Sequence, residues 1–589
     1  MRTILERRLI VCIFIVSIGF VAVGTKLLKI QFVDRKTLES VGKKQLHKTI
    51  TIKTSRGKIQ DSGRDILAIS LKSPSLYADT SKIQNISFAS TSVSRILKIS
   101  ELKLNERLSR ANRYVLLGRK LNPEQKEKIE KLDIDGLNFE MESKRFYPRR
   151  ELASSLLGFV GVDNVGLYGL EQSLNRYLEG LTRKILIHRD AKRRRINSNP
   201  SRINFPFFSS DKNIISKQTR RGFDVTLTID ANIQYFLEEE LSRQFKRAKS
   251  KKAIGIMIEV KTGHIIGLAS IPRFNPNMYS RSNSESWRES AIQDIYEPGS
   301  TFKLITAAAY LEQGGKKKEI FDAEGGKFIV QNTSKILRDH KKFGKISMED
   351  VIVNSSNIGT YKIAKKVGPK LLYQTARRFG FGSRTGLNFP GEAFGILRNP
   401  SKWSKLSLAS ISIGQEIGVT PLQMLMPVAA LANEGIMCKP RIVSHIEKFK
   451  IHFKKNDSCE GKRVISRKTA KVLTAIMGEV VSRGTGKNAQ LKGYKVGGKT
   501  GTAQKKKSGE KKYSDLDYVM SFVGFAPLNN PKIALIIIFD EGTLKGGSWG
   551  STVAAPVWKR IVVRTLRYLR IPPDEANVKF INLNLKRTF

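Results

Sequence analysis

A serine and a lysine stand three residues apart in the segment YEPGSTFKLITAAAYLEQGG, which spans residues 296–315. The segment predicts a helix that ends at Gly314 and Gly315, and a serine near a helix start is commonly only a cap. At positions i and i+3, however, the Lys303 amine lies on the same helical face as the Ser300 hydroxyl. A lysine with a lowered pKa can take the hydroxyl proton and create a nucleophile. The pair alone leaves both interpretations open.

Two further short motifs follow along the chain. The first, VNSSNIGT, contains Ser355 and Asn357. The second, GGKTGTAQ, contributes four consecutive residues: Lys499, Thr500, Gly501 and Thr502. Each motif by itself is compatible with a plain loop or turn whose side chains bond to nearby backbone. In the order S-x-x-K, S-x-N, K-T-G, the three motifs form a set used by serine acyl-transfer enzymes, which favours a catalytic site.

The elements that must position these motifs follow an α/β pattern. Val225, Leu227 and Ile229 alternate in a predicted strand, and Asp230 then caps a predicted helix. KAIGIMIEVKTGHIIGLAS predicts a hairpin, the runs 519–525 and 533–539 predict two more strands, and AAPVWKRIVVRTLRYL predicts a final helix. Strands at both ends with helices between them predict one mixed α/β domain over residues 224–575.

The preceding residues, 40–220, mix predicted strands with basic stretches that are compatible with helix. Residues 49–53 alternate as a strand, and a turn at 61–63 precedes a second apolar strand. LNPEQKEKIEKL predicts a helix with Asn122 as its cap and Pro123 at its first position. Residues 196–223 are rich in Asn, Ser and Pro and predict a domain boundary.

Residues 9–25 read LIVCIFIVSIGFVAVGT, without a charge, and with the following residues they predict a membrane anchor over 9–30. Lys26 can extend its amine to the membrane surface. The alternative is a cleaved signal peptide, but no clear small-x-small cleavage site precedes a mature start, and the apolar run is long for a signal peptide. Because basic residues flank the segment on both sides, their distribution does not decide its orientation.

The chain has 589 residues, which predicts two to four domains, and a net charge of +53. Such a charge indicates either an anionic partner or compositional drift, and the scattered basic residues favour drift. No zinc-finger spacing and no pattern of interleaved aromatic and basic residues supports a nucleic-acid partner. Cys12 lies in the apolar run, whereas Cys438 and Cys459 could pair. No Cys/His cluster has metal spacing, so we expect no metal and no cofactor.

Beyond the three motifs, longer segments resemble a class B penicillin-binding protein, a monofunctional peptidoglycan transpeptidase. RGKIQDSGRDILA (56–68) and RFYPRRELASSLLGFVGVDNVGLYGLEQSLNRYLEG (145–180) resemble the family's pedestal, although Ser62 stands where arginine is usual. ISIGQEIGVTPLQM (411–424) and SFVGFAP (521–527) resemble transpeptidase segments. The resemblance implies a tail (1–8), an anchor (9–30), a β-rich pedestal or dimerisation domain (40–220), a serine β-lactamase-like transpeptidase domain (224–575) and a C-terminal tail (576–589).

The resemblance also implies roles for the motif residues. Ser300 would attack the penultimate D-alanine carbonyl of a stem peptide and release D-alanine. An amine of a neighbouring peptidoglycan strand would then attack the acyl-enzyme and form the cross-link. Lys303 would be the base for Ser300, Ser355 would relay a proton to the leaving amine, and Asn357 would hold Lys303 and the substrate backbone.

The K-T-G strand has its own implied roles. Lys499 would keep the site electropositive, and Thr500 and Thr502 would bind the terminal carboxylate. Gly501 would leave room for the substrate to lie along the strand edge as an added strand. The backbone N–H groups of Ser300 and Thr502 would form the oxyanion hole.

Several functions are compatible with the resemblance. A septal (cell-division) type is favoured by GVDNVGLYGLE, SLYADTSKI and the chain length, and an elongation type is the alternative. A membrane-anchored β-lactamase or β-lactam sensor and a catalytically idle scaffold are further alternatives. The resemblance implies stem peptides and lipid-linked glycan strands as substrates, and β-lactams as inhibitors. It also implies a lipid-linked glycosyltransferase and divisome proteins as partners, with the catalytic domain on the periplasmic side of the inner membrane.

Overall fold

The computed structural model describes residues 2–38, 47–52, 54–109, 114–180, 183–188, 221–331, 333, 336–447, 459–506, 513–543, 547 and 549–574. The chain forms two compact units, one of Met1–Thr54 with Gly180–Arg221 and the other of Ser55–Glu179 with Gly222–Phe589. Most pedestal residues therefore belong to the same compact unit as the catalytic residues. Most of the boundary predicted at 196–223 lies outside the described residues.

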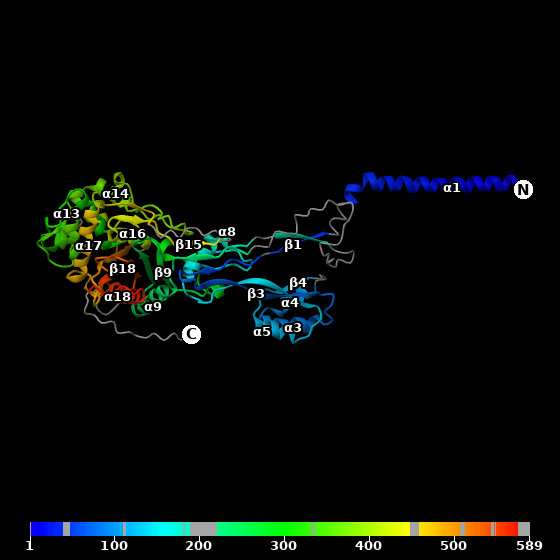
Figure 1. Ribbon diagram of the computed structural model, residues 1–589, viewed down its shortest axis with the longest axis horizontal. Helices are drawn as coiled ribbons and strands as arrows, with labels where there is room; N and C mark the ends of the chain where they lie inside the picture. Colours follow the sequence, from blue (N-terminus) through cyan, green and yellow to red (C-terminus); the bar gives the residue numbers. More distant parts are fainter. Residues whose placement is uncertain are drawn as a thin grey trace. The chain divides into compact units, whose positions relative to one another are not determined.

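The first unit contains the candidate membrane anchor. Helix α1 (Arg2–Leu28) continues into a short π-helix, η1 (Lys29–Val33), as Figure 1 shows. In the described part of the chain, one helical stretch, Arg8–Val33, is long and apolar enough to cross a membrane, with a mean hydropathy of 2.3. It fits the anchor predicted for 9–30. Strand β1 (His47–Ile52) pairs antiparallel with β6 (Arg183–His188) in the same unit.

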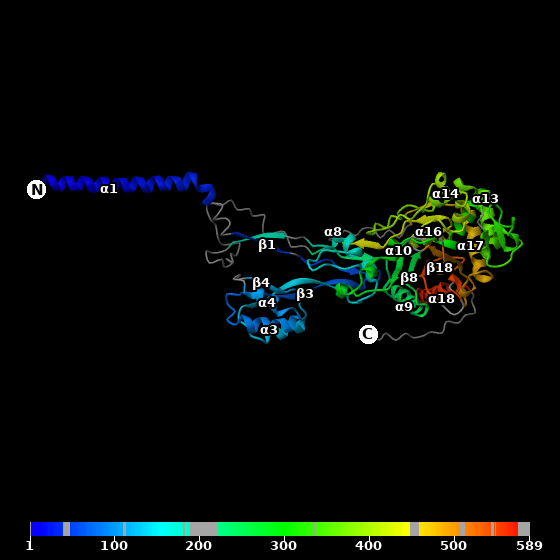
Figure 2. The same ribbon diagram turned by 180° about the vertical axis from the view of Figure 1, so that it is seen from behind.

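The pedestal part of the second unit is built on one long hairpin. Strand β3 (Ile66–Ala78) pairs along most of its length with β5 (Leu137–Phe146), from Ile69↔Phe146 to Ala78↔Leu137. One end carries β4 (Val115–Gly118) and three helices: α3 (Ile86–Leu97), α4 (Glu101–Leu108) and α5 (Pro123–Glu130). Figure 2 shows α3 and α4 together with β4 at that end. The predicted cap of α5 is confirmed, because Asn122 and Gln125 form a capping box with Pro123 at the first position.

The other end of the pedestal shares a sheet with the catalytic part. The strand order is β15-β7-β2-β3-β4, in which β2 (Ile59–Gln60) pairs parallel with β7 (Val225–Leu227). Strand β15 (Val443–Ile446) pairs with the opposite edge of β7. The predicted strand at 225–229 is thus confirmed over Val225–Leu227, and Asp230 caps α9 (Ala231–Ala248) by accepting two backbone N–H groups.

Charged residues from the two pedestal signatures meet in a buried cluster. Arg56 lies 2.7 Å and Arg145 lies 2.6 Å from the Glu171 carboxylate, and all three side chains are almost fully buried. Short helices α6 (Ser154–Leu157), α7 (Gly169–Ser173) and α8 (Asn175–Leu178) surround this region. Because a buried charge is costly unless paired, the cluster explains why both segments carry arginine.

The catalytic part is organised around a five-stranded antiparallel sheet. Its order is β17 (Gly497–Lys506), β18 (Tyr513–Ala526), β19 (Ile533–Asp540), β8 (Lys252–Glu259) and β9 (Ile265–Ile271). This confirms the predicted hairpin and the two later strands. One face packs on α9 and α18 (Gly550–Tyr568), and the other packs on α11 (Lys303–Glu312), α16 (Pro421–Ala432) and α17 (Arg467–Ser482). Strand β17 is an edge strand.

A helical lobe completes this part. Its helices are α10 (Ser290–Gln293), α12 (Met348–Val353), α13 (Asn357–Val367), α14 (Pro369–Arg378) and α15 (Ser407–Ser412). Three small ladders accompany them: β10 (Ile320–Asp322) with β13 (Lys345–Ser347), β11 (Lys327–Ile329) with β12 (Ile336–Arg338), and β14 (Ile436–Cys438) with β16 (Gly461–Arg463). This lobe carries the S-x-N motif at the start of α13.

Cys438 and Cys459 form a disulfide with their Cα atoms 5.1 Å apart, whereas Cys12 is free on α1. The bridge settles the pairing that the sequence left open. It closes a loop with a sequence separation of 21 residues. Replacing both cysteines by serine is expected to lower the free energy of unfolding by about 3 kcal/mol, since the unfolded chain gains loop freedom. Denaturant unfolding measures the change, and Cys12→Ser, the matched control, is expected to leave it unaltered.

Candidate active site

Ser300 lies in a 3-10 turn, η4 (Gly299–Thr301), directly before α11. The N-cap residue of α11 is Phe302, and neither η4 nor α11 has a side-chain cap, so the Ser300 hydroxyl does not cap the helix. Gly299 has φ +55°, and its N–H donates to the Gly414 carbonyl over 3.0 Å. A Cβ at position 299 would lie 3.0 Å from the Thr502 carbonyl oxygen, so the turn sits close against β17.

Lys303 is fully buried at the start of α11, with its amine surrounded by the S-x-N motif. Its Nζ donates to the Ser355 carbonyl over 2.6 Å, to Asn357 Oδ1 over 2.7 Å and to Ser355 Oγ over 3.3 Å. Burial lowers the pKa of Lys303 to about 7, and the nearby Asp339 carboxylate partly opposes this. A neutral amine is therefore available near neutral pH, as a general base requires.

Ser355 joins the two motif lysines. Lys499 Nζ donates to Ser355 Oγ over 2.9 Å, and Lys303 Nζ reaches the same oxygen. Burial lowers the pKa of Lys499 well below its usual range, and the Lys303 charge lowers it further. Because both pKa values are lowered, the two amines are less readily protonated at the same time than two isolated lysines would be. Ser355 itself has φ +60°. This left-handed conformation is unfavourable for a residue other than glycine, and it is often found at functional sites.

Asp339 holds the S-x-N loop in place, a role that the sequence did not reveal. Its carboxylate accepts the N–H of Asn357 over 2.5 Å and of Ile358 over 3.2 Å, and the Ser356 hydroxyl over 2.6 Å. The Asn357 amide in turn donates to the Arg338 carbonyl over 2.7 Å. This fixes the Asn357 oxygen toward Lys303. Asp339 belongs to no motif, so only the fold brings it to this site.

Asp339→Ala is expected to slow acylation by a β-lactam about 10- to 100-fold, because it leaves buried donors without an acceptor at a cost of about 1–3 kcal/mol. Stopped-flow or gel-based labelling measures the rate. Asp322→Ala, on β10, is the matched carboxylate control. Equal rates in Asp339→Ala and the native protein would contradict this positioning role.

The K-T-G strand places its threonines in bonds with neighbouring elements. The Thr500 hydroxyl lies 2.9 Å from the Thr485 hydroxyl, and the Thr502 hydroxyl accepts the N–H of Gly550 over 3.1 Å. Thr485 was not identified from the sequence, because it lies outside the three motifs. These contacts orient both hydroxyls at the sheet edge, and carboxylate binding by them stays a prediction.

Gly501 has a packing role in addition to its predicted role. A Cβ at this position would lie 2.3 Å from Ser521 Oγ, 2.9 Å from the Thr301 methyl group and 3.2 Å from the Pro298 carbonyl oxygen. Glycine therefore lets the turn that carries Ser300 close onto β17. This brings the backbone of that turn beside Thr502, as the predicted oxyanion hole requires.

A cavity of about 860 Å³ lies beside the segments that flank Ser300 and Thr502, although no residue of the three motifs lines it. It is lined by Tyr296 and Glu297, which precede the Ser300 turn, and by three residues that follow Thr502 on β17: Ala503, Gln504 and Lys505. The cavity is large enough for a small-molecule or peptide group.

The structure thus brings all three motifs together. Comparisons with known proteins give the family of the chain. A family model described as Penicillin binding protein transpeptidase domain matches residues 253–563, and one described as Penicillin-binding Protein dimerisation domain matches residues 51–204. Stage V sporulation protein D of Bacillus subtilis is 31% identical over 98% of this chain and 88% of its own length. Peptidoglycan D,D-transpeptidase FtsI of Escherichia coli is 28% identical over 89% of this chain and 85% of its own.

A solved peptidoglycan synthetase from Bifidobacterium adolescentis matches with a TM-score of 0.70 and 23% identity, over 90% of this chain and 98% of its own. The chain belongs to the penicillin-binding proteins with a transpeptidase domain. Its two matched domains are those of a class B penicillin-binding protein, an enzyme of the serine-type D-Ala-D-Ala transpeptidase class.

Proposed function

We propose that the protein cross-links peptidoglycan stem peptides through an acyl-enzyme on Ser300, during septal wall synthesis. The observation that supports this most directly is the buried Lys303 amine, which shares Ser355 with Lys499 beside the Ser300 turn. A lysine with a pKa of about 7 suits the task of a base at neutral pH.

In the first half of the reaction, Ser300 Oγ attacks the penultimate D-alanine carbonyl and its proton passes to Lys303 Nζ. The oxyanion receives hydrogen bonds from the N–H groups of Ser300 and Thr502. The intermediate then collapses, the C–N bond to the last D-alanine breaks, and the leaving amine takes a proton through Ser355. In the second half, an amine of a neighbouring stem peptide attacks the ester carbonyl, the C–O bond to Ser300 breaks as the amide cross-link forms, and a proton of the attacking amine passes to Ser300 Oγ.

Binding of the substrate follows from the position of β17 at the edge of its sheet, where no further strand pairs with it among the described residues. An extended stem peptide adds to this edge as a further strand, and its terminal carboxylate meets the hydroxyls of Thr500 and Thr502. Lys499, next to them, contributes positive potential to the extent that it is protonated. The adjoining cavity of about 860 Å³ offers room beyond the scissile bond.

The septal assignment is supported by the pedestal segments GVDNVGLYGLE and SLYADTSKI and by the chain length. A relative from Escherichia coli carries the name FtsI. An elongation-type enzyme is the alternative. A fluorescent fusion distinguishes the two, since a septal enzyme gathers at mid-cell during constriction and an elongation enzyme follows the side wall. Enrichment along the side wall alone would contradict the septal role.

The catalytic domain is proposed to lie outside the cytoplasm, with residues 1–8 inside. The Cys438–Cys459 disulfide supports this, because disulfides persist in oxidising compartments. A membrane-bound, lipid-linked glycosyltransferase and divisome proteins are the partners that such an enzyme needs, since no glycosyltransferase signature is present in the sequence.

The test is intact-mass analysis of the full-length protein after incubation with a labelled penicillin, followed by a cross-linking assay on stem-pentapeptide substrate. A single adduct on the Ser300 peptide that lasts for hours, together with cross-linked product, is the expected result. Turnover of the adduct within seconds would indicate a β-lactamase, and a stable adduct without cross-linking would indicate a sensor. No adduct in folded protein would overturn the proposal.

A further inference from the structure

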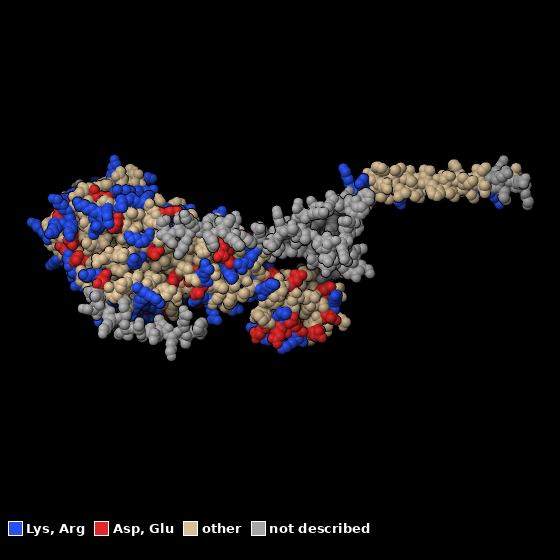
Figure 3. Space-filling view, viewed as in Figure 1, with Lys and Arg blue, Asp and Glu red and all other residues tan. Residues whose placement is uncertain are grey.

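A second cavity, of about 540 Å³, lies on the catalytic domain among residues that belong to none of the three motifs. It is lined by the turn that follows α14, by the start of α16 and by the segments on both sides of the disulfide. Four cationic residues are among those that line it: Arg377, Arg384, Lys439 and Lys462. Figure 3 shows lysine and arginine gathered on the face of this domain over α14.

The positive charge of this cavity is not balanced. Its one acidic lining residue, Glu460, already pairs with Arg441 over 2.7 Å. Arg441 and Lys439 both lower the pKa of Glu460, so this carboxylate stays ionised. Within the described ranges of the chain, none of the four cations forms an ion pair with a carboxylate. Like charges around one concave surface raise its potential and attract an anion.

The backbone that carries the two lysines is held in a defined position. Lys462 is paired with Met437 across the β14–β16 ladder, and the Lys439 N–H donates to the Glu460 carbonyl over 2.7 Å. The disulfide ties the two segments that carry these lysines. A ligand that meets prepositioned groups pays less entropy on binding.

The two arginines are also positioned. Arg377 donates to the carbonyls of Phe381 and Gly382 over 3.0 and 2.9 Å, which leaves its other N–H groups for a ligand. The Arg384 guanidinium stacks over the Phe394 ring at 4.4 Å from the centroid. Planar guanidinium groups suit the paired oxygens of phosphate and carboxylate.

We propose that this cavity binds a compact organic anion, in addition to the substrate at the catalytic site. The phosphate or carboxylate of the ligand meets the four cations, and its carbon skeleton meets the apolar part of the lining, which includes Met426, Met437 and Pro440. The volume lies in the range of small-molecule sites in proteins. A phosphosugar and a carboxylated sugar share this chemistry and represent its two sources.

The experiment is calorimetric titration of the full-length protein, in detergent and at physiological salt, with glucose 1-phosphate, N-acetylmuramic acid and inorganic phosphate. We expect an organic anion to bind more tightly than inorganic phosphate. Lys439→Gln with Lys462→Gln removes two cations whose side chains are exposed, and it is expected to weaken binding about tenfold or more. Tighter binding of the phosphate ester identifies a phosphosugar source, and tighter binding of the carboxylate identifies an acidic sugar.

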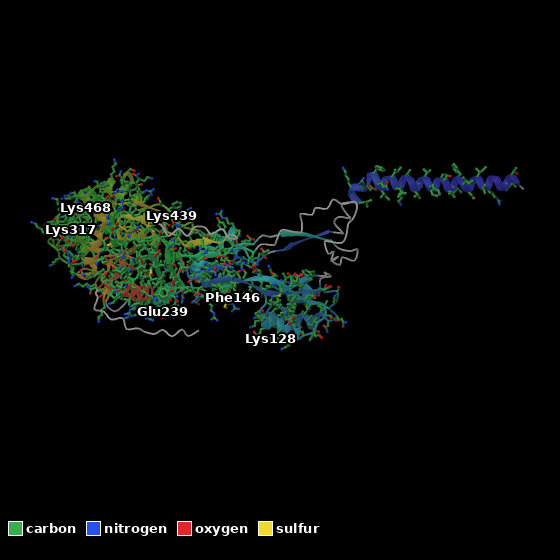
Figure 4. The ribbon with its side chains drawn as sticks, viewed as in Figure 1. Lys128, Phe146, Glu239, Lys317, Lys439 and Lys468 are labelled. Carbon is green, nitrogen blue, oxygen red and sulfur yellow. A yellow bond between two sulfur atoms is a disulfide. The ribbon has the colours of Figure 1, made fainter. Side chains whose placement is uncertain are left out.

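The matched control is Lys468→Gln with Lys471→Gln, which removes the same charge from exposed positions on α17. Figure 4 labels Lys439 and Lys468 at separate places on the domain. Acylation by penicillin and the thermal midpoint are expected to be unchanged in both double variants, which separates this proposal from the catalytic one. Equal weakening in both variants would show diffuse charge attraction and overturn the proposal. Absence of binding by all three anions to the native protein would also overturn it.

Discussion

Ser300→Ala is expected to abolish covalent labelling by penicillin and cross-linking of stem peptides. The hydroxyl is the atom that forms the ester, and removing the nucleophile of a serine enzyme costs on the order of a millionfold in rate. The turn around it should persist, because residues other than Ser300 hold it: the Gly299 N–H donates to the Gly414 carbonyl, the Thr301 hydroxyl donates to the Pro298 carbonyl, and the Ser300 hydroxyl caps no helix. Intact-mass analysis and a melting curve measure both properties on one sample.

Two variants control this result. Ser300→Cys keeps a nucleophile at the same position and is expected to retain a slow adduct with altered chemistry. Ser401→Ala removes an exposed hydroxyl elsewhere and is expected to label at the native rate. An adduct of native stoichiometry in Ser300→Ala would mean that another residue carries the acyl group.

Lys303→Gln is expected to slow acylation about 100- to 10,000-fold, which is the usual contribution of a general base. Glutamine keeps a donor for Ser355 but cannot accept the Ser300 proton. In the native protein, burial lowers the pKa of Lys303 to about 7. The amine is therefore protonated and inactive as a base below that pH, and the acylation rate should rise as pH increases through about 7 and level off above it.

The pH profile is the part of this prediction that a merely structural lysine would not produce. Second-order acylation rates from about pH 5.5 to 8.5 should show the rise in the native protein and a flat, low profile in Lys303→Gln. Lys468→Gln serves as the exposed lysine control and should keep the native profile. A native rate that is constant across this range would exclude Lys303 as the titrating base.

The sequence predicted those parts of the fold that depend on local patterns. Local patterns predicted strands at 225–229, 519–525 and 533–539, which the structure has within β7, β18 and β19, and the predicted caps at Asn122 and Asp230 are present. These signals act within a few residues and are therefore readable in one chain. The three motifs were likewise recognisable, because their residue types suit acyl transfer and their order along the chain matches a known set.

Features that depend on distant segments were not predictable in the same way. Asp339 reaches Asn357 only because α13 and the β11–β12 ladder are packed together. No local sequence pattern around Asp339 predicts this contact. The K-T-G motif predicts that Gly501 leaves room for the substrate. In the structure, the absence of a side chain at this position also allows Thr301, two hundred residues earlier in the chain, to pack against it. The 3-10 turn at Ser300 resembles a helix start in sequence, since the two differ by only one hydrogen-bond register.

The shared sheet has a mechanical consequence. The pairing of β2 with β7 joins the pedestal directly to the strand that leads into α9, and Asp61 accepts the N–H of Ala231 at the first turn of that helix. Strand β3, whose 13 residues span roughly 40 Å, connects this joint to the helices at the far end of the pedestal. A load applied to those helices is therefore transmitted along β3 to the interior strand pair β2–β7 and to the start of α9.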